Sequence, residues 1–193
     1  MTGIILAGGT SRRFGRNKLE EPIEGEPMLH RAIHAVAPLC HEILVSVPFD
    51  GDAPSTPEDV AVVLVRDQRP DEGPLIGLWT TLREASLPSA LVVGGDMPFL
   101  NTEVLRILTE ELEERSAPVV ALQDGEVVRP LPCAMRVSAR EELQRLVAGG
   151  ERRLRALVER FPLASVAEER WRISDPSGGT LTDVDRPTDL AGS

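Results

Sequence analysis

Short apolar runs alternate with amphipathic helical patterns along this chain, and the alternation constrains its fold more than any other feature. Four runs have the length and composition of buried strands: Gly3–Ala7, Ile43–Val47, Val60–Val65 and Ala90–Val93. Three helical patterns lie between or after them: one opened by Pro27, one from Pro74 to about Ala85, and one from the cap residue Asn101 to about Arg115. The order β-α-β-β-α-β-α predicts an open, largely parallel sheet covered by helices.

The rest of the chain continues the α/β pattern and includes two strands separated by a turn signal. Strands are predicted at Pro118–Leu122 and around Cys133–Arg136, with a turn signal at Asp124-Gly125 between them. Two helices are predicted at about Ser138–Val147 and Glu151–Phe161. Since ligands of such sheets bind beyond the carboxyl ends of the strands, we expect the polar motifs to gather at that edge.

Composition limits the kind of protein and partner. With 193 residues and 41% hydrophobic content, we expect one domain spanning residues 1–193. The net charge of −10 argues against a nucleic-acid-binding surface, so any bound anion is expected to be small. Cys40 and Cys133 form no metal-binding pattern, and no signal peptide or membrane-length apolar run is found, so we expect a cytoplasmic protein with no membrane partner.

The stretch LAGGTSRRFGRNK, residues 6–18, is locally cationic in this acidic chain. Gly8 and Gly9 can admit a phosphate or a base close to the backbone, although a glycine pair after a strand is also an ordinary tight turn. Lys18 is the only lysine among 21 basic residues, and a compact point charge suits a reacting phosphate. The stretch contains neither a Walker lysine nor a G-x-G-x-x-G pattern. It predicts an anion site of another kind, with Arg12 beside Lys18.

Three further loops carry carboxylates to the same predicted edge. Asp96 in GGDMPFL follows a strand, which suits a magnesium ligand but also a turn former or helix cap. Asp67 ends another strand, shortly before a helix whose amino terminus favours anions. Asp183 and Asp185 in TDVDRPTDL would share one face if this segment is extended. They are expected either to bind a metal ion or to belong to a solvated acidic loop.

Together the loops predict phosphoryl chemistry on a nucleoside triphosphate. Mg²⁺ held by Asp96 with Asp183 or Asp185 would neutralise part of the triphosphate charge, and Lys18 with Arg12 another part. An acceptor oxygen then attacks one phosphorus in line, and no protein nucleophile is required. The histidines fall in or just after the first helical pattern, away from these loops, and show no complete set of metal ligands: His30, His34 and His41.

Six motifs in this order resemble the molybdenum cofactor guanylyltransferases, the MobA family of nucleotidyltransferases: LAGGTSRRFGRNK, DEGPLIGL, GGDMPFL, RPLPCAM, GERRL and TDVDRPTDL. The resemblance spans nearly the whole chain. It implies a three-layer α/β/α sandwich of Rossmann-like type. It also implies Mg²⁺-dependent transfer of GMP from GTP to molybdenum-molybdopterin, giving the guanine dinucleotide and pyrophosphate, with transient contact to molybdopterin-synthesis proteins and molybdoenzymes.

The resemblance also implies roles for single residues. Nucleotide contacts fall on Leu6, Ala7, Gly8, Gly9, Lys18, Ser46, Asp67 and Asp96. Lys18 would meet the triphosphate with help from Arg12, and Asp96 would bind the magnesium. The segment Arg129–Pro132 and the residues Glu151, Arg152 and Arg153 would face the pterin, although GERRLRALV also suits the charged first turn of a surface helix.

The chain departs from the family pattern at several positions. Asn17 stands where the family usually has aspartate, Ser46 where it has asparagine, and Gly95 where it has cysteine. Asp183 and Asp185 replace paired asparagines and resemble the cytidylyl-transferring relatives. The sequence therefore leaves three alternatives open: CTP as donor, a sugar or phospholactate acceptor, and a cofactor-binding adaptor without turnover.

Overall fold

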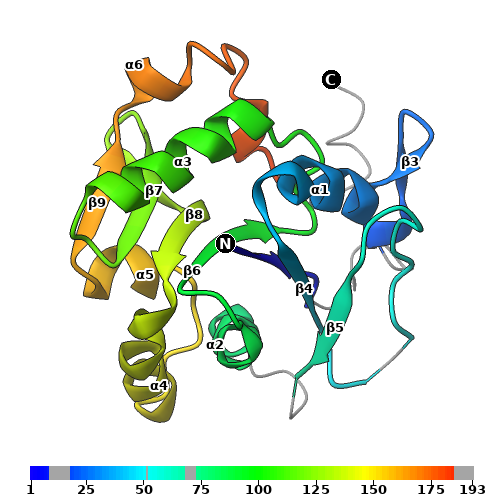
Figure 1. Ribbon diagram of the computed structural model, residues 1–193, viewed down its shortest axis with the longest axis horizontal. Helices are drawn as coiled ribbons and strands as arrows, with labels where there is room; N and C mark the ends of the chain where they lie inside the picture. The colour runs from blue at the N-terminus through cyan, green and yellow to red at the C-terminus, as the bar shows by residue number, and fades with distance from the viewer. Residues whose placement is uncertain (9–17, 51, 68–72, 185–193) are drawn as a thin grey trace.

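A computed structural model describes residues 1–8, 18–50, 52–67 and 73–184, and a seven-stranded sheet forms its centre (Figure 1). The sheet has the order β5-β4-β1-β6-β8-β7-β9. Its strands are β1 (Thr2–Leu6), β4 (Glu42–Val47), β5 (Val63–Arg66), β6 (Ser89–Gly94), β7 (Val119–Asp124), β8 (Val127–Arg136) and β9 (Leu163–Val166). A separate small hairpin is formed by β2 (Pro22–Ile23) and β3 (Glu26–Pro27).

Most strand pairs are parallel, as the sequence predicts. β1 pairs in parallel with β4 and with β6, β4 with β5, and β7 with β9. β8 runs antiparallel to both of its neighbours, β6 and β7, because the short turn at Asp124-Gly125 joins β7 and β8 directly. The expected hairpin is therefore part of the main sheet.

Helices cover both faces of the sheet and complete a three-layer α/β/α sandwich. Their bounds are α1 (Met28–Val36), α2 (Pro74–Glu84), α3 (Thr102–Glu114), α4 (Arg140–Ala148), α5 (Ala156–Arg160) and α6 (Glu168–Trp171). Successive residues of a strand point to opposite faces. Ile5 accordingly packs in the core layer that contains α1 and α3 side chains, and Ile4 in the layer that contains those of α2, α4 and α5. The predicted Rossmann-like fold class is confirmed.

Several boundaries differ from the sequence expectation for local reasons. The strand expected from Val60 begins at Val63. The helix expected from Glu151 begins at Ala156, because the Glu151 carboxylate accepts the backbone N–H groups of Arg152 and Arg153 and forms a turn instead. The sequence did not predict β2, β3, β9 or α6, because each of these elements is four residues or shorter.

Glycine spacing near β1 gives a test of this packing. A Cβ added at Gly3 would lie 2.6 Å from Cγ1 of Val36 and 2.9 Å from Cδ1 of Ile43, whereas at Gly8 the nearest atom is Asp67 Oδ2 at 3.6 Å. We expect Gly3→Ala to lower the free energy of unfolding by about 1–3 kcal/mol, because the core must shift to admit a methyl group. Gly8→Ala is the matched control and should stay within about 0.5 kcal/mol of wild type. Urea denaturation measures both, and equal stabilities for the two variants would contradict the packing described.

Candidate active site

Backbone hydrogen bonds bring the carboxyl ends of four strands to one edge of the sheet. Leu6 at the end of β1 lies opposite Ser46 of β4 and Gly94 of β6. The bonding continues past the strand ends. Ala7 N–H donates to Ser46 O (2.9 Å), Gly95 N–H to Leu6 O (3.0 Å) and Asp67 N–H to Val47 O (3.0 Å). Gly8, Asp67 and Asp96 therefore leave the sheet at the same edge, as predicted.

The most direct polar contact at this edge joins Lys18 to Asp96. Lys18 begins a 3₁₀ turn, Lys18–Glu20, whose Leu19 is buried in the core, and its Nζ lies 2.8 Å from Asp96 Oδ2. Both side chains are largely screened from water, with 17% and 29% of their surfaces exposed. The ammonium also donates to the carbonyl of Val184 (3.3 Å), and Val184 N–H donates to Asp96 O (2.9 Å). Three segments distant in sequence thus meet at one ion pair.

The Asp96 carboxylate suits a divalent cation as well as an ammonium. Its Oδ2 accepts from Lys18, whereas Oδ1 receives no hydrogen bond from the part of the chain that the structure describes. A Cβ at Gly94 would lie 2.6 Å from Oδ1, so a glycine at this position keeps the space for the carboxylate. Asp183 is exposed and directly precedes Val184. Hard cations prefer such carboxylate oxygens, and the residues present fit Mg²⁺.

Asp67 lies in a space that two glycines keep open. Its Oδ2 lies 3.6 Å from the position of a Cβ on Gly8, and its Oδ1 lies 3.5 Å from that of a Cβ on Gly77 in α2. Ser46 is 1% exposed, and its Oγ lies 2.8 Å from the position that a Cβ would take at Gly77. A Cβ at Gly77 would clash with Ser46 Oγ, whereas a Cβ at Gly8 would make an ordinary contact with Asp67. The structure therefore gathers Ser46 and Asp67 beside the loop that begins at Gly8.

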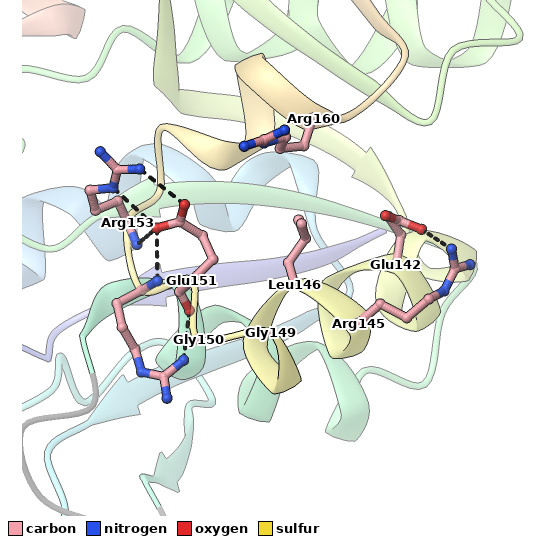
Figure 2. A pocket seen from close by; sticks show the side chains of 9 residues that line it. Glu142, Arg145, Leu146, Gly149, Gly150, Glu151, Arg153 and Arg160 are labelled. Atoms are coloured by element: carbon pink, nitrogen blue, oxygen red, sulfur yellow. Dashed lines mark hydrogen bonds and ion pairs between the residues drawn. The ribbon is translucent and has the colours of Figure 1, made fainter.

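An arginine-rich hollow of about 720 Å³ lies next to the start of α2 (Figure 2). Its lining includes Glu151, Arg152, Arg153 and Arg160. The Leu75 N–H in the first turn of α2 donates to the carbonyl of Arg152 (3.1 Å), which connects this hollow to the sheet edge. The Arg153 side chain and the backbone N–H groups of Arg153 and Arg152 stabilise the Glu151 carboxylate and lower its pKa to about 2. Glu151 is consequently ionised at neutral pH and fixes Arg153.

Not every sequence-predicted site residue is placed. Gly9, Arg12 and Asp185 lie outside the described residues. Arg129 is described, and its guanidinium bonds Asp124 of the β7–β8 hairpin through Nε (3.0 Å) and Nη2 (2.7 Å). Sequence reasoning missed Val184, because it contributes backbone atoms and an apolar side chain to the site, and neither leaves a polar signal.

The histidines take structural positions. His34 in α1 contacts two carboxylates, with Nδ1 2.6 Å from Glu26 Oε1 and Nε2 3.1 Å from Asp59 Oδ1. His30 contacts the hydroxyl of Ser55 (3.0 Å). No group of three His, Cys, Asp or Glu side chains positioned to hold a metal ion is found within residues 1–8, 18–50, 52–67 and 73–184. In the same ranges no helix is long and apolar enough to cross a membrane.

The mostly parallel sheet and the lysine–aspartate pair at its carboxyl edge suit one class of protein, the α/β nucleotidyltransferases, and the match to a family model shows that class. Within this class the chain belongs to the family of the MobA-like NTP transferase domain, whose family model matches residues 3–167. The chain is therefore a transferase, as the sequence predicts.

Individual relatives agree with this assignment. A protein of Chloroflexus aggregans named "Probable molybdenum cofactor guanylyltransferase" is 35% identical over 98% of this chain and 91% of its own length. The structure is similar to that of molybdopterin-guanine dinucleotide biosynthesis protein A from Archaeoglobus fulgidus, with a TM-score of 0.79, 23% identity and coverage of 99% and 95% of the two chains. It also shares its fold with Rv0371C from Mycobacterium tuberculosis, solved in complex with manganese, with a TM-score of 0.63, 18% identity and 86% of each chain covered.

His34 makes stability depend on pH in a testable way. Burial lowers its pKa, but hydrogen bonds to Asp59 and Glu26 outweigh this effect and raise the pKa above the ordinary 6.5. Since the charged imidazolium alone can donate from both nitrogens, its stabilising effect is complete below the unfolded pKa and is lost as pH rises through the raised one. We expect His34→Gln to lower the melting temperature at about pH 6 and to have little effect at about pH 9. An equal loss at both values, measured by calorimetry, would show that the charge is not involved.

Proposed function

We propose that this protein transfers GMP from GTP to the terminal phosphate of molybdenum-molybdopterin, in a Mg²⁺-dependent reaction that releases pyrophosphate. The observation that carries the proposal is the Lys18–Asp96 pair, 2.8 Å apart, at the sheet edge where the Gly8 loop begins. The name of the Chloroflexus relative supports the guanylyl donor and the cofactor acceptor. We also propose a single-domain, cytoplasmic enzyme that contacts molybdopterin-synthesis proteins and molybdoenzymes transiently.

The reaction needs positioning and charge more than a protein nucleophile. An acceptor phosphate oxygen forms a bond to the α-phosphorus of GTP as the bond to the β-phosphate bridging oxygen breaks, and pyrophosphate carries the electron pair away. Lys18, with Arg12, would bind the phosphate oxygens on which charge develops. Asp96 with Asp183 or Asp185 would hold Mg²⁺, which supplies charge neutralisation when bound. The manganese complex of the mycobacterial protein supports a divalent cation in this fold.

Asp67 gives a chemical reason for choosing guanine. An ionised carboxylate accepts two parallel hydrogen bonds, and guanine offers adjacent N1–H and N2–H donors on one edge. Cytosine and adenine each place a ring acceptor beside the amino group, which would face the carboxylate unfavourably. Leu6, Ala7, Gly8 and Gly9 would line the nucleoside beside Asp67 and Ser46. At Gly8 the nearest atom to an added Cβ is Asp67 Oδ2 at 3.6 Å, which supports a base that approaches Asp67 past this glycine.

The arginine-rich hollow is the proposed acceptor side. Arg152 contacts the start of α2 through its carbonyl, and Arg153 lines the same hollow. A guanidinium group can donate two parallel hydrogen bonds to phosphate oxygens. The pairing of Arg153 with Glu151 keeps that side chain in place before the acceptor arrives. The segment Arg129–Pro132 belongs to the same proposal, as the family resemblance implies.

A second donor, CTP, is favoured by one observation: aspartates at 183 and 185 resemble the cytidylyl-transferring relatives. We expect GTP with Mg²⁺ to raise the melting temperature more than CTP, ATP or UTP does. A ligand present at about a hundred times its dissociation constant adds roughly 2.7 kcal/mol to the free energy of unfolding. Asp67→Asn exchanges one acceptor for a donor and should remove most of the preference for GTP. A larger shift with CTP would establish the second donor, and no shift with any nucleotide would favour an adaptor without turnover.

Substitutions at the ion pair test catalysis itself. We expect Lys18→Ala and Asp96→Asn each to lower the rate of pyrophosphate release by about 100-fold or more, because each removes a charge that acts on the reacting phosphates. Both variants should remain folded, since the pair lies at the sheet edge and neither residue belongs to the two large apolar core clusters. Arg106→Ala removes an exposed pair with Glu103 on α3 and serves as the control with unchanged rate. Normal turnover in the two site variants would refute the catalytic roles proposed for Lys18 and Asp96.

A further inference from the structure

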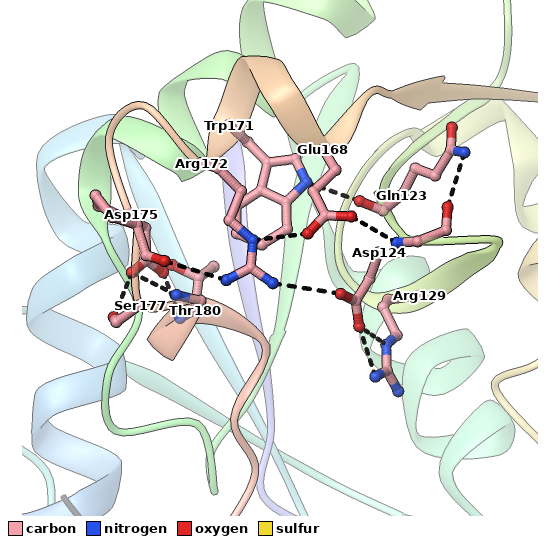
Figure 3. A network of polar contacts seen from close by, with 12 residues as sticks. Gln123, Asp124, Arg129, Glu168, Trp171, Arg172, Asp175, Ser177 and Thr180 are labelled. Carbon is pink, nitrogen blue, oxygen red and sulfur yellow. Dashed lines mark hydrogen bonds and ion pairs between the residues drawn. The ribbon is translucent and has the colours of Figure 1, made fainter.

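The C-terminal arm, residues 171–184, begins beside the β7–β8 turn and ends at the Lys18–Asp96 pair. Figure 3 shows the polar contacts of its first part, from Trp171 to Thr180. At its start the buried Trp171 donates its Nε1–H to the carbonyl of Gln123 (2.8 Å). The Arg172 guanidinium lies 4.5 Å from the centroid of the Trp171 ring and bonds Glu168 (2.9 Å) and Asp124 (3.5 Å). The first part of the arm is thereby fixed to the sheet.

Asp175 folds the middle of the arm into a tight turn. The residue is 6% exposed, and its Oδ1 accepts from Ser177 Oγ (2.8 Å) and from the backbone N–H groups of Gly178 (3.1 Å) and Gly179 (3.2 Å). Its Oδ2 accepts from the N–H of Thr180 (2.7 Å). Burial raises the pKa of Asp175, but these donors outweigh it and leave the pKa lowered. The ionised carboxylate therefore organises four donors of its own segment.

Thr180 then attaches this turn to the loop that follows Asp96. Thr180 is fully buried, and its Oγ1 accepts the N–H of Asn101 (3.1 Å). Asn101 Nδ2 donates in return to Ser174 O (2.9 Å), while its Oδ1 caps α3. A Cβ at Gly179 would lie 3.2 Å from Cβ of Phe99, so the turn packs closely on the same loop. Asn101 therefore hydrogen-bonds the arm on both sides of the turn, at Ser174 and at Thr180.

The arm ends in the ion pair of the active site. Val184 is fully buried in a small cluster with Ile23 and Met28. Its N–H donates to Asp96 O (2.9 Å), and its carbonyl accepts from Lys18 Nζ (3.3 Å). Only three residues lie between Thr180 and Val184, so the loss of the Thr180 tether leaves a short segment through which backbone freedom can reach Val184.

We propose that Thr180 and Asp175 are positioning residues for nucleotidyl transfer, acting through the C-terminal arm on Lys18, Asp96 and Asp183. The inference rests on the proposed function and extends it to residues that touch no substrate. When the Thr180 tether is lost, Val184 no longer holds the Lys18 ammonium and the Asp96 backbone together. Asp183, which directly precedes Val184, would then be less fixed for its proposed role as a metal ligand.

The test compares Thr180→Val with Thr180→Ser. Valine keeps the shape of threonine but removes the acceptor of the Asn101 N–H, whereas serine keeps the hydroxyl. In Thr180→Val we expect backbone hydrogen exchange at Val184 to become about tenfold faster, with exchange at Ile4 and Val92 in the central strands unchanged. The rate of pyrophosphate release should fall about tenfold, and the Mg²⁺ concentration for half-maximal rate should rise. Thr180→Ser should restore all three values.

Two results would overturn the inference. The first is unchanged hydrogen exchange at Val184 together with an unchanged Mg²⁺ requirement. The second is exchange at Ile4 and Val92 that becomes faster to the same extent as at Val184. Each would mean that the tether serves only general stability. Asp175→Asn is the second variant, in case Thr180→Val does not fold, and should give the same pattern. Exchange at Val184 does not depend on turnover. A wild-type protein that released no pyrophosphate would thus refute the proposed function alone, and the exchange comparison would still decide whether the tether holds Val184.

Discussion

The parallel register of β1 between β4 and β6 is the constraint on which the rest of the site depends. With Leu6 opposite both Ser46 and Gly94, the three strands end in one row, and every loop that follows them starts at the same edge. Backbone hydrogen bonds fix this register, and both faces of β1 are buried, so a shift by one residue would exchange its two core faces. The positions of Gly8, Asp67 and Asp96 follow from this arrangement.

The site pairs the only lysine of an acidic chain with a carboxylate. Lys18 is held by Asp96 and by the carbonyl of Val184, so its ammonium is paired locally before any anion arrives. An acidic chain discourages long polyanions, while an ammonium beside a carboxylate suits a small anion accompanied by a cation. This balance favours a nucleotide with its metal over a nucleic acid.

Glycines decide how closely the carboxylates of the site approach the backbone. Gly94 leaves room for Asp96, and Gly77 in α2 leaves room for Ser46 and Asp67. These positions lie in or directly beside regular elements, where glycine destabilises the fold because it loses more conformational entropy on folding than other residues do. Close packing of a polar side chain against the backbone explains why glycine is found there.

The sequence by itself determined the layers of the fold and the edge of the sheet at which the candidate site lies. Apolar runs of strand length and stripes of helical period identify buried elements locally, and Asn101 marks the start of α3 through its side chain. The alternation of these elements implied a sheet edge at which Lys18 and Asp96 would meet. Only the tertiary structure decided the pairing of β9 with β7, the turn that Glu151 makes in place of a helix, and the contact of Val184 with Asp96 and Lys18. Each depends on a backbone group meeting a partner supplied by the folded chain. Because every residue carries the same backbone donor and acceptor, except proline, which lacks the donor, the sequence does not mark which of them will be used.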